Sequence, residues 1–163
     1  ARMNVQRDRV TGALEILAEA GIDTASVPLV ERHINDAETT EDAARELLKN
    51  NPDLTAVVCT TDSMALGLLR YAESAGIDVP GELSVTGFDG IPQAEAAGVV
   101  TVRQPSRTKG RLSGEHLAEE IRERRKAAKN RKSAPSRAHS ETPPAVYLET
   151  TVLEGTSIAP PRA

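Results

Sequence analysis

Residues 53–90, DLTAVVCTTDSMALGLLRYAESAGIDVPGELSVTGFDG, decide the fold class of this chain. The β-branched, apolar run at 55–60 is typical of a buried strand. The segment 62–76 has a helical pattern, with N-capping residue types at its start and a glycine at its end. The run at 83–88 predicts a second strand. A strand, a helix and another strand in this order predict a crossover between two parallel strands.

Strand and helix patterns alternate along most of the chain, which has 163 residues, the size of one ordinary domain. Further helices are predicted at 7–20, 39–50 and 106–125, and further strands at 26–30, 99–103 and 145–153. We therefore predict an α/β fold in which helices flank a parallel sheet. Apolar residues make up 39% of the chain and aromatic residues only 2%, so the core should be mostly aliphatic.

Polar residues follow two of the predicted strands. Thr61 and Asp62 come after the strand at 55–60, and Asp89 comes after the strand at 83–88. Ligands of parallel α/β sheets bind beyond the carboxyl ends of the strands, so these side chains should share one rim. An ionised Asp89 there would accept hydrogen bonds from the hydroxyls of a sugar or polyol. Two structural alternatives stay open, in which Asp89 caps a following turn or helix and either Asp62 or Thr61 is the N-cap of the helix at 62–76.

Charge is unevenly distributed along the chain. The net charge is −4, yet residues 122–139 hold eight Lys or Arg and one Glu. An acidic remainder excludes a globally basic nucleic-acid-binding surface. The basic run is predicted to be a solvated, flexible linker, and a phosphate-binding tail is the alternative.

Signatures of common enzymes and metal sites are missing from the sequence. It has no GxGxxG or GxxxxGK(S/T) loop for nucleotide phosphates, no HExxH or CxxC metal motif and no GxSxG elbow. We therefore expect a protein that is not an enzyme and needs no cofactor or metal. Cys59, the single cysteine, lies in a predicted strand, where an inert thiol is expected. A lone cysteine suits the cytoplasm, and no apolar run is long enough to cross a membrane.

Segment 53–90 also resembles the core signature of the lactose-repressor/galactose-repressor family of bacterial transcription factors. The matching residues are Thr55-Ala56, Asp62, Met64-Ala65, Gly67, Gly76-Ile77, Val79-Pro80, Ser84-Val85 and Gly87-Phe88-Asp89. Downstream, VVTVRQPSRTKG (99–110) is similar to the family's Leu-Thr-Thr-Val-x-Gln-Pro, and LEGTSIAPP (153–161) to its Arg-Gly-Ser-Thr-x-Pro-Pro ending. Upstream, RDRVTG (7–12) is similar to its Arg-x-x-Gly.

The resemblance implies a periplasmic-binding-protein-like (type I) fold of two lobes. This chain would hold the distal lobe and the final crossing segments. The implied division is a distal lobe at 1–104, a proximal-lobe helix at 105–125, a basic flexible linker at 126–145 and returning strands with a tail at 146–163. Most of the proximal lobe, in which that helix would pack, is absent from this sequence.

The resemblance also implies an effector site. By motif position its residues are Arg9, Thr61, Asp89 and Gln104. Thr61 stands where the family has asparagine, and a hydroxyl has less reach than an amide. Gly90 and Glu154 depart from the family pattern as well. These departures leave the identity of the effector open.

The implied function is that of a ligand-responsive transcriptional regulator, a repressor that senses a small polar molecule such as a sugar. It would be a cytoplasmic homodimer whose interface includes helix 62–75, segment 91–98, Leu66 and Arg70. It would reach operator DNA only through a headpiece missing from this sequence, whose opening ARMNVQRDRV suggests a fragment. No membrane partner is expected. The alternatives are a periplasmic-type solute-binding protein and a nucleotide-binding α/β enzyme.

Overall fold

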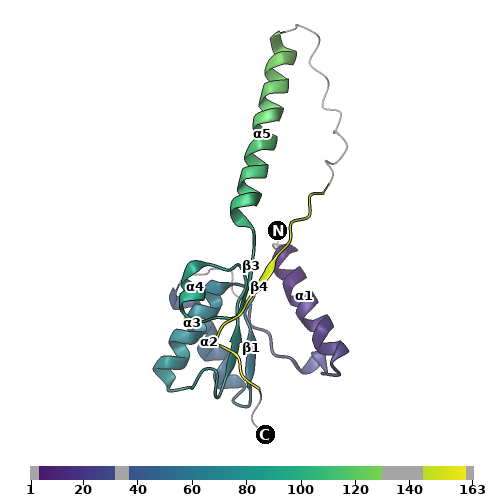
Figure 1. Ribbon diagram of the computed structural model, residues 1–163. Helices are drawn as coiled ribbons and strands as arrows, with labels where there is room; N and C mark the ends of the chain where they lie inside the picture. Colours follow the sequence, from purple (N-terminus) through teal and green to yellow (C-terminus); the bar gives the residue numbers. More distant parts are fainter. Residues whose placement is uncertain (1–3, 32–36, 130–144, 161–163) are drawn as a thin grey trace. The chain divides into compact units, whose positions relative to one another are not determined.

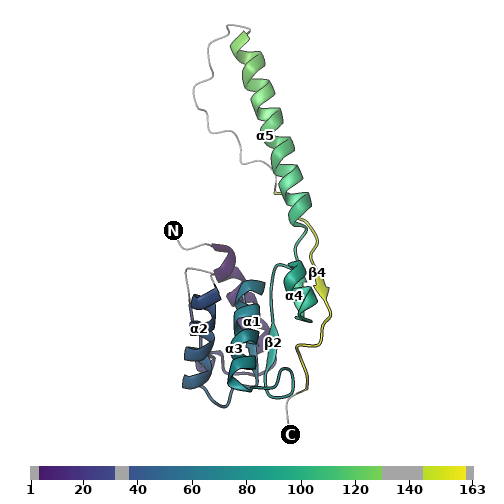
Figure 2. The ribbon, with the colours of Figure 1, turned by 90° about the vertical axis from the view of Figure 1, so that its left-hand side faces the viewer.

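The computed structural model describes residues 4–31, 37–129 and 145–160 (Figures 1 and 2). The chain divides into two compact units, Ala1–Arg103 with Thr151–Ala163, and Gln104–Thr150. The first unit contains α1 (Asn4–Glu19), the 3-10 helix η1 (Thr24–Ser26), α2 (Ala37–Asn50), β1 (Ala56–Val58), α3 (Asp62–Ala75), β2 (Ser84–Thr86), α4 (Pro92–Ala96), β3 (Thr101–Arg103) and β4 (Thr151–Leu153). The second unit contains α5 (Ser106–Lys129).

The predicted strand–helix–strand unit is confirmed. β1 and β2 are parallel neighbours with Val57 opposite Val85, and α3 connects them (Figure 1). Two single parallel bridges, Thr86 to Val100 and Asp89 to Arg103, continue the pairing from β2 towards β3. β3 then pairs with β4 in the antiparallel direction. The fold is therefore α/β with a parallel centre, to which the C-terminal strand adds an antiparallel pair.

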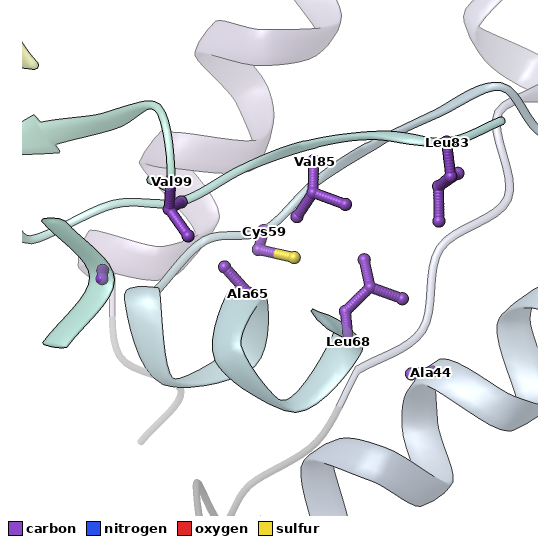
Figure 3. Packing of buried hydrophobic residues seen from close by; sticks show 8 residues of the cluster. Ala44, Cys59, Ala65, Leu68, Leu83, Val85 and Val99 are labelled. Atoms are coloured by element: carbon purple, nitrogen blue, oxygen red, sulfur yellow. The ribbon is translucent and has the colours of Figure 1, made fainter. Parts of the chain in front are cut away.

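The core of the first unit lies between α3 and the strands. Figure 3 shows Ala65 and Leu68 of α3 beside Cys59, Leu83 and Val85 from the strand side. Ala65 and Val85 are completely buried. Every buried apolar residue in the described part of the chain is aliphatic or a cysteine, which matches the prediction from composition. Side-chain burial of this kind is the main force that holds such a unit together.

Helix α2 packs against α3 (Figure 2). Gly67 permits this close approach, because a Cβ at that position would overlap the side chain of the buried Thr40. Arg70 Nε on α3 also donates to Glu41 Oε1 on α2 at 2.6 Å. Part of the α3 surface is thus covered by α2 of the same chain.

The C-terminal tail is hydrogen-bonded to β2. Val85 N donates to the Ser157 carbonyl at 2.8 Å, and Ser157 Oγ donates to the Val85 carbonyl at 2.6 Å. Ala159 N donates to Ser84 Oγ at 3.0 Å. Residues after β4 therefore belong to the first unit, although they follow the second unit in sequence.

The strand predicted at 26–30 is wrong. Residues Thr24–Ser26 form η1, and Asp23 caps it by accepting a hydrogen bond from Ala25 N at 3.1 Å. No strand follows in the described residues up to 31. Pro28 lacks the N–H that a strand would donate to its neighbour. The prediction rests on the apolar run alone and does not take this missing donor into account.

Helix α5 is longer than predicted, and the strand predicted at 145–153 is shorter, covering only Thr151–Leu153. Residues 126–129 of the expected linker, Lys-Ala-Ala-Lys, are helical, because Lys and Ala favour helices. Lys126 Nζ also pairs with Glu123 Oε1 at 2.7 Å. Residues 130–144 of that expected linker lie outside the described residues. None of the described side chains of α5 is buried.

Candidate functional site

The loop after β2 has an unusual backbone. Asp89 has φ 120° and Gly90 has φ 71°. A positive φ is rare for a residue with a side chain and costs about 1–3 kcal/mol, so the surrounding structure must hold Asp89 in place. Asp89 N donates to the Val102 carbonyl at 3.0 Å, and a Cβ at Gly90 would collide with Arg103. The loop is therefore pressed against β3 at the carboxyl end of β2.

Arg9 on α1 meets this loop. Its Nη2 lies 3.1 Å from Asp89 Oδ1, and its Nη1 donates to the Thr60 carbonyl at 2.6 Å. The guanidinium carbon stands 4.0 Å from the centre of the Phe88 ring, a cation–π contact. The Arg9 side chain is 13% exposed and that of Asp89 is 32% exposed. The Asp89 carboxylate therefore lies at the surface, within reach of a dissolved molecule.

Thr61 lies at the same end of the sheet, next to the Thr60 carbonyl that Arg9 contacts. Its side-chain oxygen accepts a hydrogen bond from Met64 N at 3.3 Å and so forms the N-cap of α3. The residue is only 7% exposed. The structure thus brings Arg9, Thr61 and Asp89 together, but it gives the Thr61 hydroxyl a capping role.

The sequence offers Asp62 or Thr61 as the N-cap of α3, and in the structure Thr61 takes that position. Asp62 is completely buried. Its Oδ1 accepts from Thr101 Oγ1 at 2.5 Å, and its Oδ2 accepts from Ile91 N at 2.7 Å. A carboxylate directly after an apolar strand was visible in the sequence, but both partners lie far along the chain.

The other predicted site residues lie elsewhere. Gln104 belongs to the second unit, where its side chain accepts a hydrogen bond from Lys109 Nζ. Leu66 on α3 is half-buried, and Arg70 pairs with Glu41 of its own chain.

Burial and, to a smaller extent, the nearby Asp62 charge raise the pKa of the Cys59 thiol from its ordinary value of 9.0 to about 12. Such a thiol stays protonated at neutral pH and is a poor nucleophile. Among the residues that the structure describes, no three His, Cys, Asp or Glu side chains come together as a metal site. In the same residues, no helix has the length and apolarity needed to cross a bilayer.

The chemistry available at this rim is recognition by hydrogen bonds. Arg9 offers N–H donors and Asp89 offers carboxylate acceptors beside the Phe88 ring. Their opposite charges balance, so the pair suits a neutral molecule with neighbouring hydroxyls better than an ionised one. The Phe88 ring lies against the Arg9 guanidinium and helps to hold it at this rim.

Comparisons with known proteins identify the family to which this chain is similar. The family described as "Periplasmic binding protein-like domain" matches residues 2–140. The chain is 42% identical over 160 residues to the HTH-type transcriptional regulator IpsA of Corynebacterium glutamicum, covering 98% of this chain and 40% of that protein. This chain therefore spans well under half the length of that relative.

Solved structures give the same result. A crystal structure of a LacI-family transcriptional regulator from Corynebacterium glutamicum matches with a TM-score of 0.83 and 42% identity, over 98% of this chain and 42% of that one. A transcriptional regulator CelR–cellobiose complex matches with a TM-score of 0.67 and 27% identity, over 91% of this chain and 41% of that one.

Proposed function

Because this chain belongs to the periplasmic-binding-protein-like family and, within it, to the LacI-type transcriptional regulators, we propose that it forms the distal lobe and final crossing segments of a repressor's effector-binding core. The observation that carries the proposal is the contact of Arg9 with Asp89 at the carboxyl ends of the strands. These are two of the four residues that motif position assigns to the effector. They lie 80 positions apart in sequence, and the fold brings them together.

The effector in this proposal is a neutral sugar or polyol. Its hydroxyls would donate to Asp89 and accept from Arg9, with Phe88 beside them. The match to a regulator whose structure was solved with cellobiose supports the class of ligand. Thr61, at the same rim, and Gln104 remain proposed contacts by their motif positions.

The test is a ligand screen on the intact regulator that contains this chain. Thermal shifts with neutral sugars and polyols, ribose and cellobiose included, identify a ligand, and calorimetry then measures its affinity. Asp89→Asn should weaken binding about tenfold or more, because one charge-assisted hydrogen bond is lost. Asp53→Asn, at an exposed turn before β1, is the matched control and should leave affinity unchanged. Unchanged affinity in Asp89→Asn would exclude Asp89 from the site.

The regulator is also proposed to act as a cytoplasmic homodimer, with helix α3 and segment 91–98 at the interface. Leu66 and Arg70 are the proposed contacts, and Arg70 would keep its pairing with Glu41 at the edge of that surface. Leu66→Arg should shift the sedimentation coefficient of the intact protein towards that of a monomer. A dimer of undiminished stability would remove this face from the interface.

Operator binding is proposed to occur through a headpiece outside this sequence, and the effector would bias the arrangement of the lobes. A ligand found in the screen should then change the affinity of the intact protein for its operator, measured by fluorescence anisotropy. Equal operator affinity with and without a saturating ligand would contradict an effector role. The enzyme and transport alternatives gain no support from relatives that are transcriptional regulators.

A further inference from the structure

Asp62 makes hydrogen bonds on both sides of the Asp89 loop. Its backbone N–H donates to the Phe88 carbonyl at 2.7 Å, and its carboxylate accepts from Ile91 N at 2.7 Å. Phe88 and Ile91 immediately flank Asp89 and Gly90, the two consecutive residues with positive φ. One residue at the start of α3 therefore holds both ends of the strained turn.

The same carboxylate reaches the strand behind the loop. Asp62 Oδ1 accepts from Thr101 Oγ1 at 2.5 Å. Thr101 begins β3, and the residues on either side of it bind the backbone of the loop. The Val100 carbonyl accepts from Gly87 N at 2.8 Å, and the Val102 carbonyl accepts from Asp89 N at 3.0 Å. A Cβ at Gly87 would overlap Asp62 Oδ1, so the carboxylate packs directly against the loop backbone.

The Asp62 carboxylate and its partner Thr101 are both buried. Asp62 and Thr101 are at most 1% exposed, and no basic side chain in the described part of the chain forms an ion pair with Asp62. A buried carboxylate is costly unless its oxygens are hydrogen-bonded. Capping α3 does not explain it, because Thr61 already caps that helix. Its remaining partners all belong to the Asp89 loop or to the strand that supports it.

We propose that Asp62 is a positioning residue that locks the backbone of residues 88–91 and thereby directs the Asp89 carboxylate towards Arg9. Through Thr101 it also fastens this loop to β3, the strand that runs directly into Gln104, where the second unit begins. The positioning role concerns the ligand-free chain. Its consequence for effector affinity rests on the proposed function.

The first test therefore needs no effector. Amide hydrogen exchange and proton–nitrogen NMR spectra of the intact protein report on the Ile91 and Asp89 amides. Asp62→Asn and Thr101→Val should each speed exchange at Ile91 about tenfold or more and shift the Asp89 amide, and Thr101→Ser should restore the parent values because it keeps the hydroxyl. Exchange and shifts unchanged in both Asp62→Asn and Thr101→Val would overturn the proposal.

A control separates positioning from general loss of stability. Gly76→Ala weakens α3 at its opposite end, because Gly76 has φ 73°, which alanine adopts only with strain. A Cβ there meets only open space, so no neighbouring residue has to move. It should lower the denaturant midpoint yet leave the Asp89 and Ile91 amide shifts unchanged. Loop shifts in Gly76→Ala equal to those in Asp62→Asn would also overturn the proposal, because Asp62 would then act only through stability. If Asp62→Asn does not fold, the Thr101→Val and Thr101→Ser pair carries the test.

The second test uses a sugar or polyol identified by the screen. Asp62→Asn should weaken its binding about tenfold, while Thr101→Ser should bind as the parent does. Loop changes without an affinity change would keep the positioning role and contradict the proposed effector site. Affinity loss without loop changes would contradict the positioning role instead.

Discussion

Replacing Asp89 by glycine should weaken effector binding about tenfold or more and leave the stability of the protein nearly unchanged. Replacing it by alanine should weaken binding in the same way and should also destabilise the protein. The reason is the backbone of Asp89, whose φ is 120°. Glycine adopts this conformation without steric cost, but alanine carries a Cβ and keeps the strain. Both variants lose the carboxylate that pairs with Arg9.

The sizes of the effects follow from the structure. The Arg9–Asp89 pair spans 3.1 Å between side chains that are 13% and 32% exposed, so solvent screening limits its loss to about 1 kcal/mol. Relief of the strain regains about 1–3 kcal/mol. The extra freedom of glycine in the unfolded chain costs about 0.5–1 kcal/mol. Asp89→Gly should therefore be up to about 2.5 kcal/mol more stable than Asp89→Ala, the reverse of the usual order.

Urea unfolding of the parent and both variants measures this difference, and calorimetry with a ligand from the screen measures binding. Asp53→Gly and Asp53→Ala form the control pair at an exposed turn, where φ is not positive. There the glycine variant should not gain over the alanine variant. An Asp89→Ala protein that is as stable as Asp89→Gly would refute the strain argument.

Three further outcomes follow from the core. The Cys59 thiol, whose pKa is raised to about 12, should resist iodoacetamide at pH 8 until the protein unfolds. The stability that comes from keeping this thiol neutral is present below about pH 9 and is lost as the pH rises towards 12. Urea midpoints measured across that pH range would show the loss. Gly67→Ala should lower the free energy of unfolding by about 1–3 kcal/mol, because its Cβ overlaps Thr40 and pushes α2 from α3, and an unchanged urea midpoint would contradict this packing. Leu68→Ala, at a site 2% exposed, should lower the free energy of unfolding by about 2–5 kcal/mol. Leu117→Ala, at a site 62% exposed, should lower it by less than about 0.5 kcal/mol, and equal urea midpoints for the two variants would contradict this core.

Local patterns were sufficient to predict the centre of the fold. The apolar run before Thr61, the helix from Asp62 to Gly76 and the run ending at Asp89 each depend on neighbours within a few residues. Strand alternation, capping residue types and helical spacing act over the same short range, which is why the parallel β1–α3–β2 unit could be predicted. The same local logic failed at 26–30, where capping by Asp23 and the missing N–H of Pro28 override an apolar run.

The sequence by itself determined the α/β class, the aliphatic core and the placement of Thr61 and Asp89 after parallel strands. Only the tertiary structure decided what those side chains do. Arg9 reaches Asp89 across 80 positions, and Asp62 finds Ile91 and Thr101 at 29 and 39 positions. The strength of a hydrogen bond falls steeply with distance and angle. Partners this far apart in sequence therefore meet only if α1, α3 and β3 pack together correctly. The strained φ of Asp89 has the same origin, because it persists only where long-range contacts hold the loop.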